Sequence, residues 1–269
     1  MSIQILLVLF FTFIIYIIST FAYTVRIVGI RTGRIAVAFA VFNVFALISR
    51  MANGLQAPFL SKRIETNINN GSPEDLTWIF RLILLSATLA TITGALLMPT
   101  FIKLFSKSVE AFSYHRSIPK LIMHGFSKSG IEQFRKSITV PGSQNIPRIG
   151  SFKKVPKKIV LLNAFAFSIS TVGGLASLYA GSRYPELRTT CSVLSPVVNM
   201  FATLSMFLLI DPYISLMTDD VLKGKCSSQE FDRTIVFLVA GLICGTIVAQ
   251  ALLVPLSELI RIAAVLIPA

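Results

Sequence analysis

Residues 3–25 have the sequence IQILLVLFFTFIIYIISTFAYTV, a run of 23 residues without a charged side chain. A helix needs about 20 predominantly apolar residues to cross the hydrocarbon core of a bilayer. The run therefore predicts a transmembrane helix. It is too long for the apolar region of a cleaved signal peptide, and no positively charged segment precedes it.

The composition of the whole chain agrees with this reading. Of its 269 residues, 54% are hydrophobic and 14% are charged, and the mean hydropathy is +0.75. Soluble domains carry about 25% charged residues, so an ordinary cytoplasmic enzyme, a disordered chain and a disulfide-stapled secreted module are all excluded. Five more apolar stretches follow the first: residues 35–49 with an apolar extension, 82–102, 159–180, 191–217 and 234–256. We therefore predict an all-α polytopic membrane protein with six transmembrane helices.

The segments between the six spans alternate between the two sides of the membrane, and their basic residues are unevenly shared. One side carries 18 Lys and Arg residues, in segments 26–34, 103–158 and 218–233, and the other side carries 7. Because cytoplasmic segments hold the excess of Lys and Arg, the pattern predicts that both termini lie outside and that the basic middle of the chain lies inside.

The segment 103–158 accounts for most of the net charge of +13, because it has 12 basic and 2 acidic residues. Stretches 101–112 and 118–134 mix apolar and basic residues at helical spacing, which predicts helices lying on an anionic leaflet. The alternative is recruitment of an anionic cytoplasmic ligand. Nothing resembles a nucleic-acid-binding module, so no nucleic acid partner is expected. We divide the chain into a three-helix unit (1–105), a basic loop (106–158) and a second three-helix unit (159–269).

An internal repeat with an offset of 156 residues relates these two units. Without gaps, 16 of the 77 residues from 23 to 99 are identical to their counterparts, among them Asn43 with Asn199 and four of the five residues of segment 95–99 with those of segment 251–255. The alternative is chance similarity between two apolar sequences. Because each copy holds three spans, the second copy would lie upside down relative to the first, and such inverted repeats are typical of transporters.

Four polar residues interrupt the spans, where an ionisable side chain is costly and is by default a functional candidate. We predict that Arg50 binds an anionic substrate group, and that Asp211, Asn43 and Asn199 take part in gating or coupling. Arg50 and Asp211 would pair as a gate in the outer half of the protein. The alternatives are that Arg50 reaches the headgroups, that Asp211 is a helix-end carboxylate near water, and that the asparagines only join helices by hydrogen bonds.

Arg26, Arg31 and Arg34 are clustered in the segment VRIVGIRTGR, where Gly29 and Gly33 permit a tight turn. Guanidinium groups bind phosphate oxygens in pairs of parallel hydrogen bonds, so the cluster suits a diphosphate. Anchoring of the cytoplasmic side by positive charge is the alternative. Lysine would serve that purpose equally well, however, and all three residues are arginine.

Signatures of catalysis are missing from the sequence. It contains no nucleophile elbow, no HExxH and no phosphate-binding P-loop. The three cysteines have unrelated spacings and form no metal or disulfide motif. We therefore expect no catalytic residue, no metal and no cofactor.

The segment STFAYTVRIVGIRTGRIAV (residues 19–37), with Asn43, Asn53 and segment 56–58 beyond it, resembles the Amj family, the alternate lipid II flippases of Bacillus and related bacteria. In the second half, Asp211 and Asp219 are also similar to residues of that family. The resemblance covers most of the chain and is weakest in residues 106–158.

This resemblance implies a protein of the bacterial plasma membrane. It would move lipid II, an undecaprenyl-diphosphate-linked disaccharide pentapeptide, from the inner to the outer leaflet for cell-wall synthesis, alongside or in place of the MurJ-type flippase. The expected partners are lipid II, membrane lipids and a second copy in a homodimer. A membrane enzyme acting on a polyprenyl-phosphate lipid is the main alternative, and a scaffold without transport comes third.

Overall fold

The computed structural model describes residues 2–70, 76–115, 137, 139 and 155–267, and this part of the chain is helical without a strand. The helices of the first half are α1 (Ile3–Ala22), α2 (Val25–Thr32), α3 (Ile35–Asn69) and α4 (Thr77–His115). The second half consists of α8 (Lys157–Arg183), η3 (Pro185–Leu187), α9 (Arg188–Val193), α10 (Ser195–Ser205), η4 (Met206–Ile210), α11 (Asp211–Leu222) and α12 (Ser228–Leu266).

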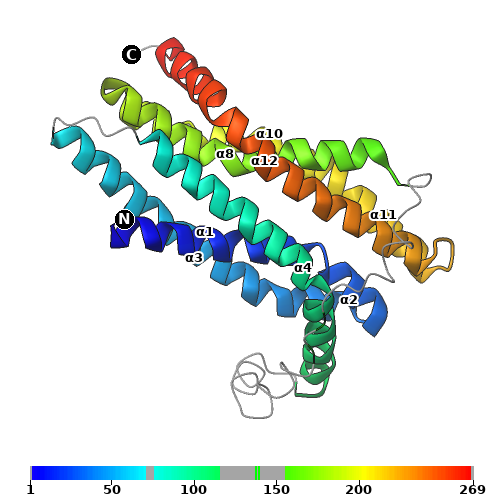
Figure 1. The fold of residues 1–269 in the computed structure, drawn as a ribbon. Helices are drawn as coiled ribbons and strands as arrows, with labels where there is room; N and C mark the ends of the chain where they lie inside the picture. Colours follow the sequence, from blue (N-terminus) through cyan, green and yellow to red (C-terminus); the bar gives the residue numbers. More distant parts are fainter. Residues whose placement is uncertain (1, 71–75, 116–136, 138, 140–154, 268–269) are drawn as a thin grey trace.

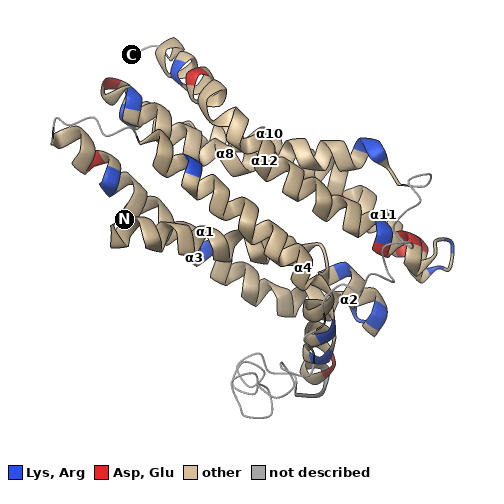
Figure 2. Cartoon of the chain, viewed as in Figure 1, with Lys and Arg blue, Asp and Glu red and all other residues tan. Residues whose placement is uncertain are grey.

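Six spans in this part of the chain are long and apolar enough to cross a membrane, which confirms the predicted fold class. Helices α1 and α2 together make the first span, and η3 to α11 make the fifth. The elongated bundle has two ends (Figure 1). One end, which we call the α2 end, holds α2 and the turn between α11 and α12, and both termini lie at the opposite end. Most charged residues lie toward the two ends (Figure 2).

The first helix of each half is central to its unit. Helix α1 packs along α3 and α4, helix α8 packs along α10 and α12, and α12 joins the halves by its contact with α4. The α8–α12 contact is close because it is lined by glycine: a Cβ on Gly245 would lie 2.7 Å from the carbonyl oxygen of Ala164. Small residues at such contacts let membrane helices approach each other.

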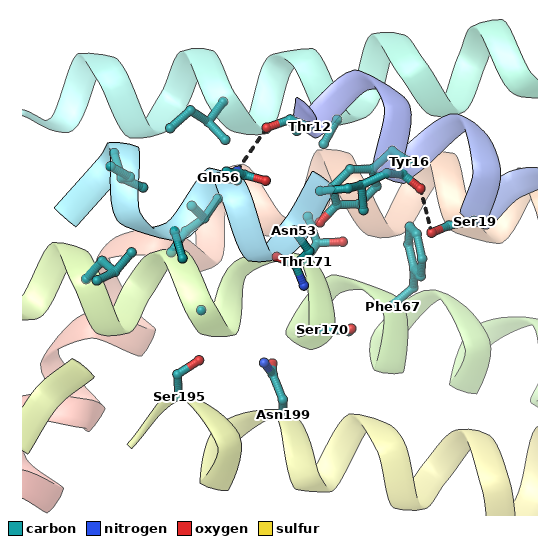
Figure 3. Close-up of a pocket in the computed structure, with 18 of the residues that line it drawn as sticks. Thr12, Tyr16, Ser19, Asn53, Gln56, Phe167, Ser170, Thr171, Ser195 and Asn199 are labelled. Atoms are coloured by element: carbon teal, nitrogen blue, oxygen red, sulfur yellow. Dashed lines mark hydrogen bonds between the residues drawn. The ribbon is translucent and has the colours of Figure 1, made fainter. Parts of the chain in front are cut away.

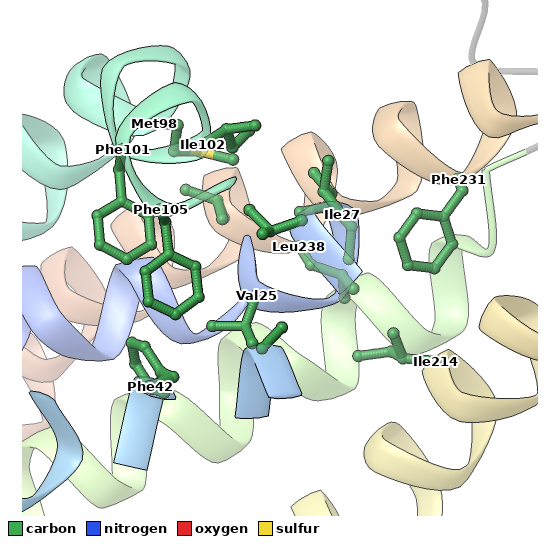
Figure 4. Packing of buried hydrophobic residues seen from close by; sticks show 14 of the residues in the cluster. Val25, Ile27, Phe42, Met98, Phe101, Ile102, Phe105, Ile214, Phe231 and Leu238 are labelled. Atoms are coloured by element: carbon green, nitrogen blue, oxygen red, sulfur yellow. The ribbon is translucent and has the colours of Figure 1, made fainter. Parts of the chain in front are cut away.

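The α2 end has an aromatic core that includes part of the segment expected on the membrane surface (Figure 4). Phe101 and Phe105 are buried, and the Phe101 ring stacks on Phe21 of α1 with centroids 4.1 Å apart. Phe42 of α3 meets Phe105 edge to face. The prediction for 101–112 was therefore wrong for its apolar face, which packs against the protein rather than the leaflet. Segment 118–134 lies outside the described residues.

The fifth span is not a single α-helix, and one of its interruptions lies next to Pro212. Pro212 has no amide hydrogen to donate to the carbonyl group of Leu208, four residues earlier. The turn before it, η4, is a π-helix. π-Helical turns of this kind occur often at functional sites. The fifth span is also the least buried of the six, so α10, η4 and α11 form an irregular element that the rest of the protein covers only in part.

The 156-residue repeat stays a prediction. The expected counterparts Pro99 and Pro255 both lie inside the third span of their half. The proposed boundaries at 105 and 159 fall within α4 and α8, because α4 continues as a helix to His115.

Candidate functional site: a polar cavity between the two halves

A cavity of about 380 Å³ lies near the middle of the bundle, between α1, α3, α8 and α10 (Figure 3). Its lining mixes polar and apolar residues, and none of the described lining residues is charged. The polar residues are Thr12, Tyr16, Ser19, Asn53, Gln56, Ser170, Thr171, Ser192, Ser195 and Asn199. The cavity reaches the surface at α3, because Asn53 and Ala57 line it and are exposed.

Glycines of α8 determine how closely α10 approaches the cavity. A Cβ on Gly173 would collide with the Asn199 side-chain oxygen, and a Cβ on Gly174 would lie 3.4 Å from the Ser195 hydroxyl oxygen. Figure 3 shows Ser195 and Asn199 directed from α10 toward α8. The Gly173–Gly174 pair therefore positions the polar face of α10 against the cavity.

Asn199 is, with Thr171, one of two cavity residues that the described part of the fold leaves with an unsatisfied side-chain oxygen. Its side-chain oxygen is buried and accepts no hydrogen bond within the described part of the chain. A buried acceptor without a donor costs free energy, so such a group in a cavity points to a ligand or water that supplies the donor.

Across the cavity, side chains of α1 and α3 hold each other in place. Gln56 donates from Nε2 to the Thr12 hydroxyl oxygen at 3.0 Å, and Thr12 donates to the carbonyl oxygen of Val8 at 2.8 Å. Tyr16 meets Phe167 of α8 edge to face, with ring centroids 5.9 Å apart. These contacts hold the amide of Gln56, the hydroxyl of Thr12 and the ring of Tyr16 in place around the cavity.

The predicted arginine cluster lies at the α2 end, and two of its three members are paired. Arg26 donates to Asp211 at 3.3 Å and to the Ser215 hydroxyl at 3.4 Å. Arg31 donates to Asp232 of α12 at 2.7 Å. Both ion pairs join α2 of the first half to the second half.

The third arginine, Arg34, is exposed directly after the turn that ends α2. The two predicted glycines are both required there. Gly33 adopts a positive φ of 66° as the helix cap, a conformation that favours glycine. At Gly29 an added Cβ would lie 2.9 Å from the Cα of Ile35. The turn thus holds the start of α3 against α2.

The predicted Arg50–Asp211 gate was wrong. Asp211 pairs with Arg26 at the α2 end. The fifth span runs from the end with the termini toward the α2 end, so Asp211, near its close, lies at the depth of α2. Arg50 lies near the middle of α3, about half the length of that helix from its start at the α2 end.

Arg50 and Asn43 are exposed on α3, and Asn199 alone of the predicted gating residues lines the cavity. Arg50 lies one helical turn from the cavity residue Asn53, about 4.5 Å along the axis. The sequence reasoning did not select Tyr16, although Thr12, Tyr16 and Ser19 share one helix face at spacings of four and three.

The chain matches the family described as "Amj: Alternate to MurJ" over residues 11–264. It belongs to the Amj family. The lipid II flippase Amj of Bacillus subtilis (strain 168) is 33% identical over 253 residues, covering 94% of this chain and 93% of that protein. No solved structure matches. These names indicate a transporter rather than the membrane enzyme considered from the sequence.

Proposed function

We propose that this protein flips lipid II from the inner to the outer leaflet of the bacterial plasma membrane. The observation that carries the proposal is the uncharged polar cavity in the middle of a six-span bundle of the Amj family, open to the surface at α3. A polar headgroup crosses a bilayer only where protein replaces water around it. An opening beside α3 allows the lipid tail to remain in the bilayer while the headgroup occupies the cavity.

The α2 end faces the cytoplasm in this proposal, and both termini lie outside. The distribution of 18 basic residues on one side against 7 on the other supports this orientation. Arg26, Arg31 and Arg34 then lie at the inner leaflet, where lipid II is made available.

Arg26, Arg31 and Arg34 take up the diphosphate at this end. In the present structure Asp211 and Asp232 hold two of these arginines. A diphosphate offers more oxygen acceptors and more negative charge than one carboxylate, so it competes for the same guanidinium groups. Arg50 contacts the diphosphate later, at the level of the cavity.

The same ion pairs keep the α2 end closed in the state described here. Displacing Asp211 and Asp232 releases α2 from α11 and α12, and the π-helical turn η4 lies directly before Asp211. Such movement of the two halves is the mode of transport that an inverted repeat supports. A homodimer stays a prediction. The described cavity is lined by residues of one chain, so the proposed transport does not need a second copy.

Complementation tests the function. The gene is expressed in cells whose other lipid II flippases can be depleted, and an externally added probe measures lipid II on the outer surface. We expect growth and surface lipid II to be restored. Abundant, correctly inserted protein without surface lipid II would refute the proposal, and a chemically altered lipid would instead reveal an enzyme.

A further inference from the structure

We propose that the central cavity is a saccharide-binding subsite, which holds the sugars of the headgroup while the diphosphate stays outside it. This inference rests on the proposed flippase function and assigns one part of the substrate to the cavity. It follows from the donors, acceptors and charges that line the cavity.

The absence of charge in the lining excludes the diphosphate as the occupant. No Lys, Arg, His, Asp or Glu is among the described residues that line the cavity. A multiply charged anion in the middle of a membrane needs cationic partners to offset its lost hydration. Uncharged sugars with many hydroxyl groups need only hydrogen-bond partners.

The unsatisfied acceptor at Asn199 points the same way. Its buried side-chain oxygen can be satisfied only by a donor. An ionised diphosphate has no donor to offer, whereas sugar hydroxyls and acetamide N–H groups do. Gln56 and Asn53 add amide groups from the opposite side of the cavity, and amides both donate and accept.

Two aromatic residues of the lining suit the apolar faces of sugar rings. Tyr16 and Phe167 line the same space and present aromatic surface beside the hydroxyl groups of Ser170 and Thr171 (Figure 3). Pockets for small molecules combine such surface with a few placed polar groups and measure about 300–1,000 Å³. At about 380 Å³ the cavity has room for a mono- or disaccharide but not for the whole headgroup with its peptide.

The position of Arg50 explains where the diphosphate lies while the sugars are bound. Arg50 is exposed on α3, one turn from Asn53, where the cavity reaches the surface. The order along the lipid is tail, diphosphate, sugar. With the tail in the bilayer and the sugars in the cavity, the diphosphate falls at this opening beside Arg50.

The test measures binding to the purified full-length protein in lipid nanodiscs. Three competitors displace a fluorescent lipid II: lipid II itself, the same lipid without its pentapeptide, and undecaprenyl diphosphate without sugars. We expect the two sugar-bearing lipids to bind alike and about tenfold more tightly than undecaprenyl diphosphate, the ratio that corresponds to about 1.4 kcal/mol.

Variants locate this discrimination in the cavity. Asn199→Ala and Gln56→Ala should each weaken binding of the sugar-bearing lipids about fivefold or more and leave undecaprenyl diphosphate within about twofold. Thr203→Ala is the matched control, because Thr203 is exposed on α10 one turn beyond Asn199 and does not line the cavity. Should Asn199→Ala fail to fold, Asn53→Ala, at an exposed position, takes its place.

Equal affinity of the wild type for lipid II and undecaprenyl diphosphate would overturn the inference. So would loss of affinity when only the pentapeptide is removed, because the cavity would then hold peptide. Neither result removes the flippase function, which complementation measures separately. A wild type that neither binds lipid II nor restores surface lipid II would instead refute the proposed function.

Discussion

The Arg26–Asp211 pair provides the sharpest test of how the α2 end opens. The side chain of Arg26 is 15% exposed and that of Asp211 is 45% exposed, and their atoms are 3.3 Å apart. Exposed pairs contribute about 0.2–1 kcal/mol, and breaking a fully buried pair costs about 3–5 kcal/mol. Because this pair is partly exposed and long, we expect it to stabilise the closed form by about 1 kcal/mol. Losing that energy changes the ratio of closed to open forms about fivefold.

The assay follows access to the cavity from the cytoplasmic side. Cys191, Cys226 and Cys244 are replaced by alanine, and Ser19→Cys places a single thiol in the cavity lining. Inside-out vesicles are treated with a membrane-impermeant thiol reagent. Asp211→Asn should raise the labelling rate about fivefold, because Arg26 loses its ionic partner.

Three further variants make the interpretation specific. Arg26→Ala should raise the rate similarly, the double variant should add little, and the charge swap should restore slow labelling. Asp219→Asn is the control, because Asp219 is exposed on the same helix and is not among the described residues that line the central cavity. Unchanged labelling in Asp211→Asn, or additive effects in the double variant, would refute a gate made by this pair.

Three other predictions concern packing, loading and orientation. Gly173→Ala should push Asn199 away from α8, which should destabilise the protein by about 1–3 kcal/mol and reduce transport. Thermal unfolding and complementation measure these two effects. Gly54→Ala is the control and should have neither effect, because a Cβ at Gly54 would have no atom within 4 Å. Arg31→Lys and Arg34→Lys keep the charge but lose the paired hydrogen bonds, so complementation should fall at equal abundance, and full activity would leave only a topological role. A single cysteine at the exposed Lys225 should react with an impermeant reagent only in inside-out vesicles, and labelling in intact cells would reverse the orientation.

The apolar spans were predictable because about 20 consecutive apolar residues in one stretch are a local property of the sequence. The turn with Gly29 and Gly33 was predictable for the same reason. The partner of Asp211 was not. That partner depends on how deep Asp211 lies in the membrane, and the fifth span begins with short helices and contains a π-helical turn. A repeat alignment without gaps does not record this geometry.

The cavity was also beyond local reasoning, since its residues come from helices far apart in the sequence. Single serines and threonines in spans usually bond to their own helix, as Ser19 does to the carbonyl oxygen of Ile15. Only their convergence distinguishes a site. Asn53 and Gln56 lie within the segment that resembles the Amj family, but a single amide side chain in a span does not by itself indicate whether it faces a cavity.

The separation of charge from the cavity has a consequence for transport. A carrier must bind its substrate well enough to load it and weakly enough to release it on the other side. Arginines in the middle of the cavity would hold the diphosphate strongly in a low-dielectric environment and slow its release. Here two of the three arginines at the α2 end already pair with Asp211 and Asp232, so each carboxylate can recapture its guanidinium when the diphosphate leaves. The neutral cavity then binds the sugars by hydrogen bonds that water can replace. Closure of the α2 end prevents return to the cytoplasmic side, so the headgroup is released to the outer side.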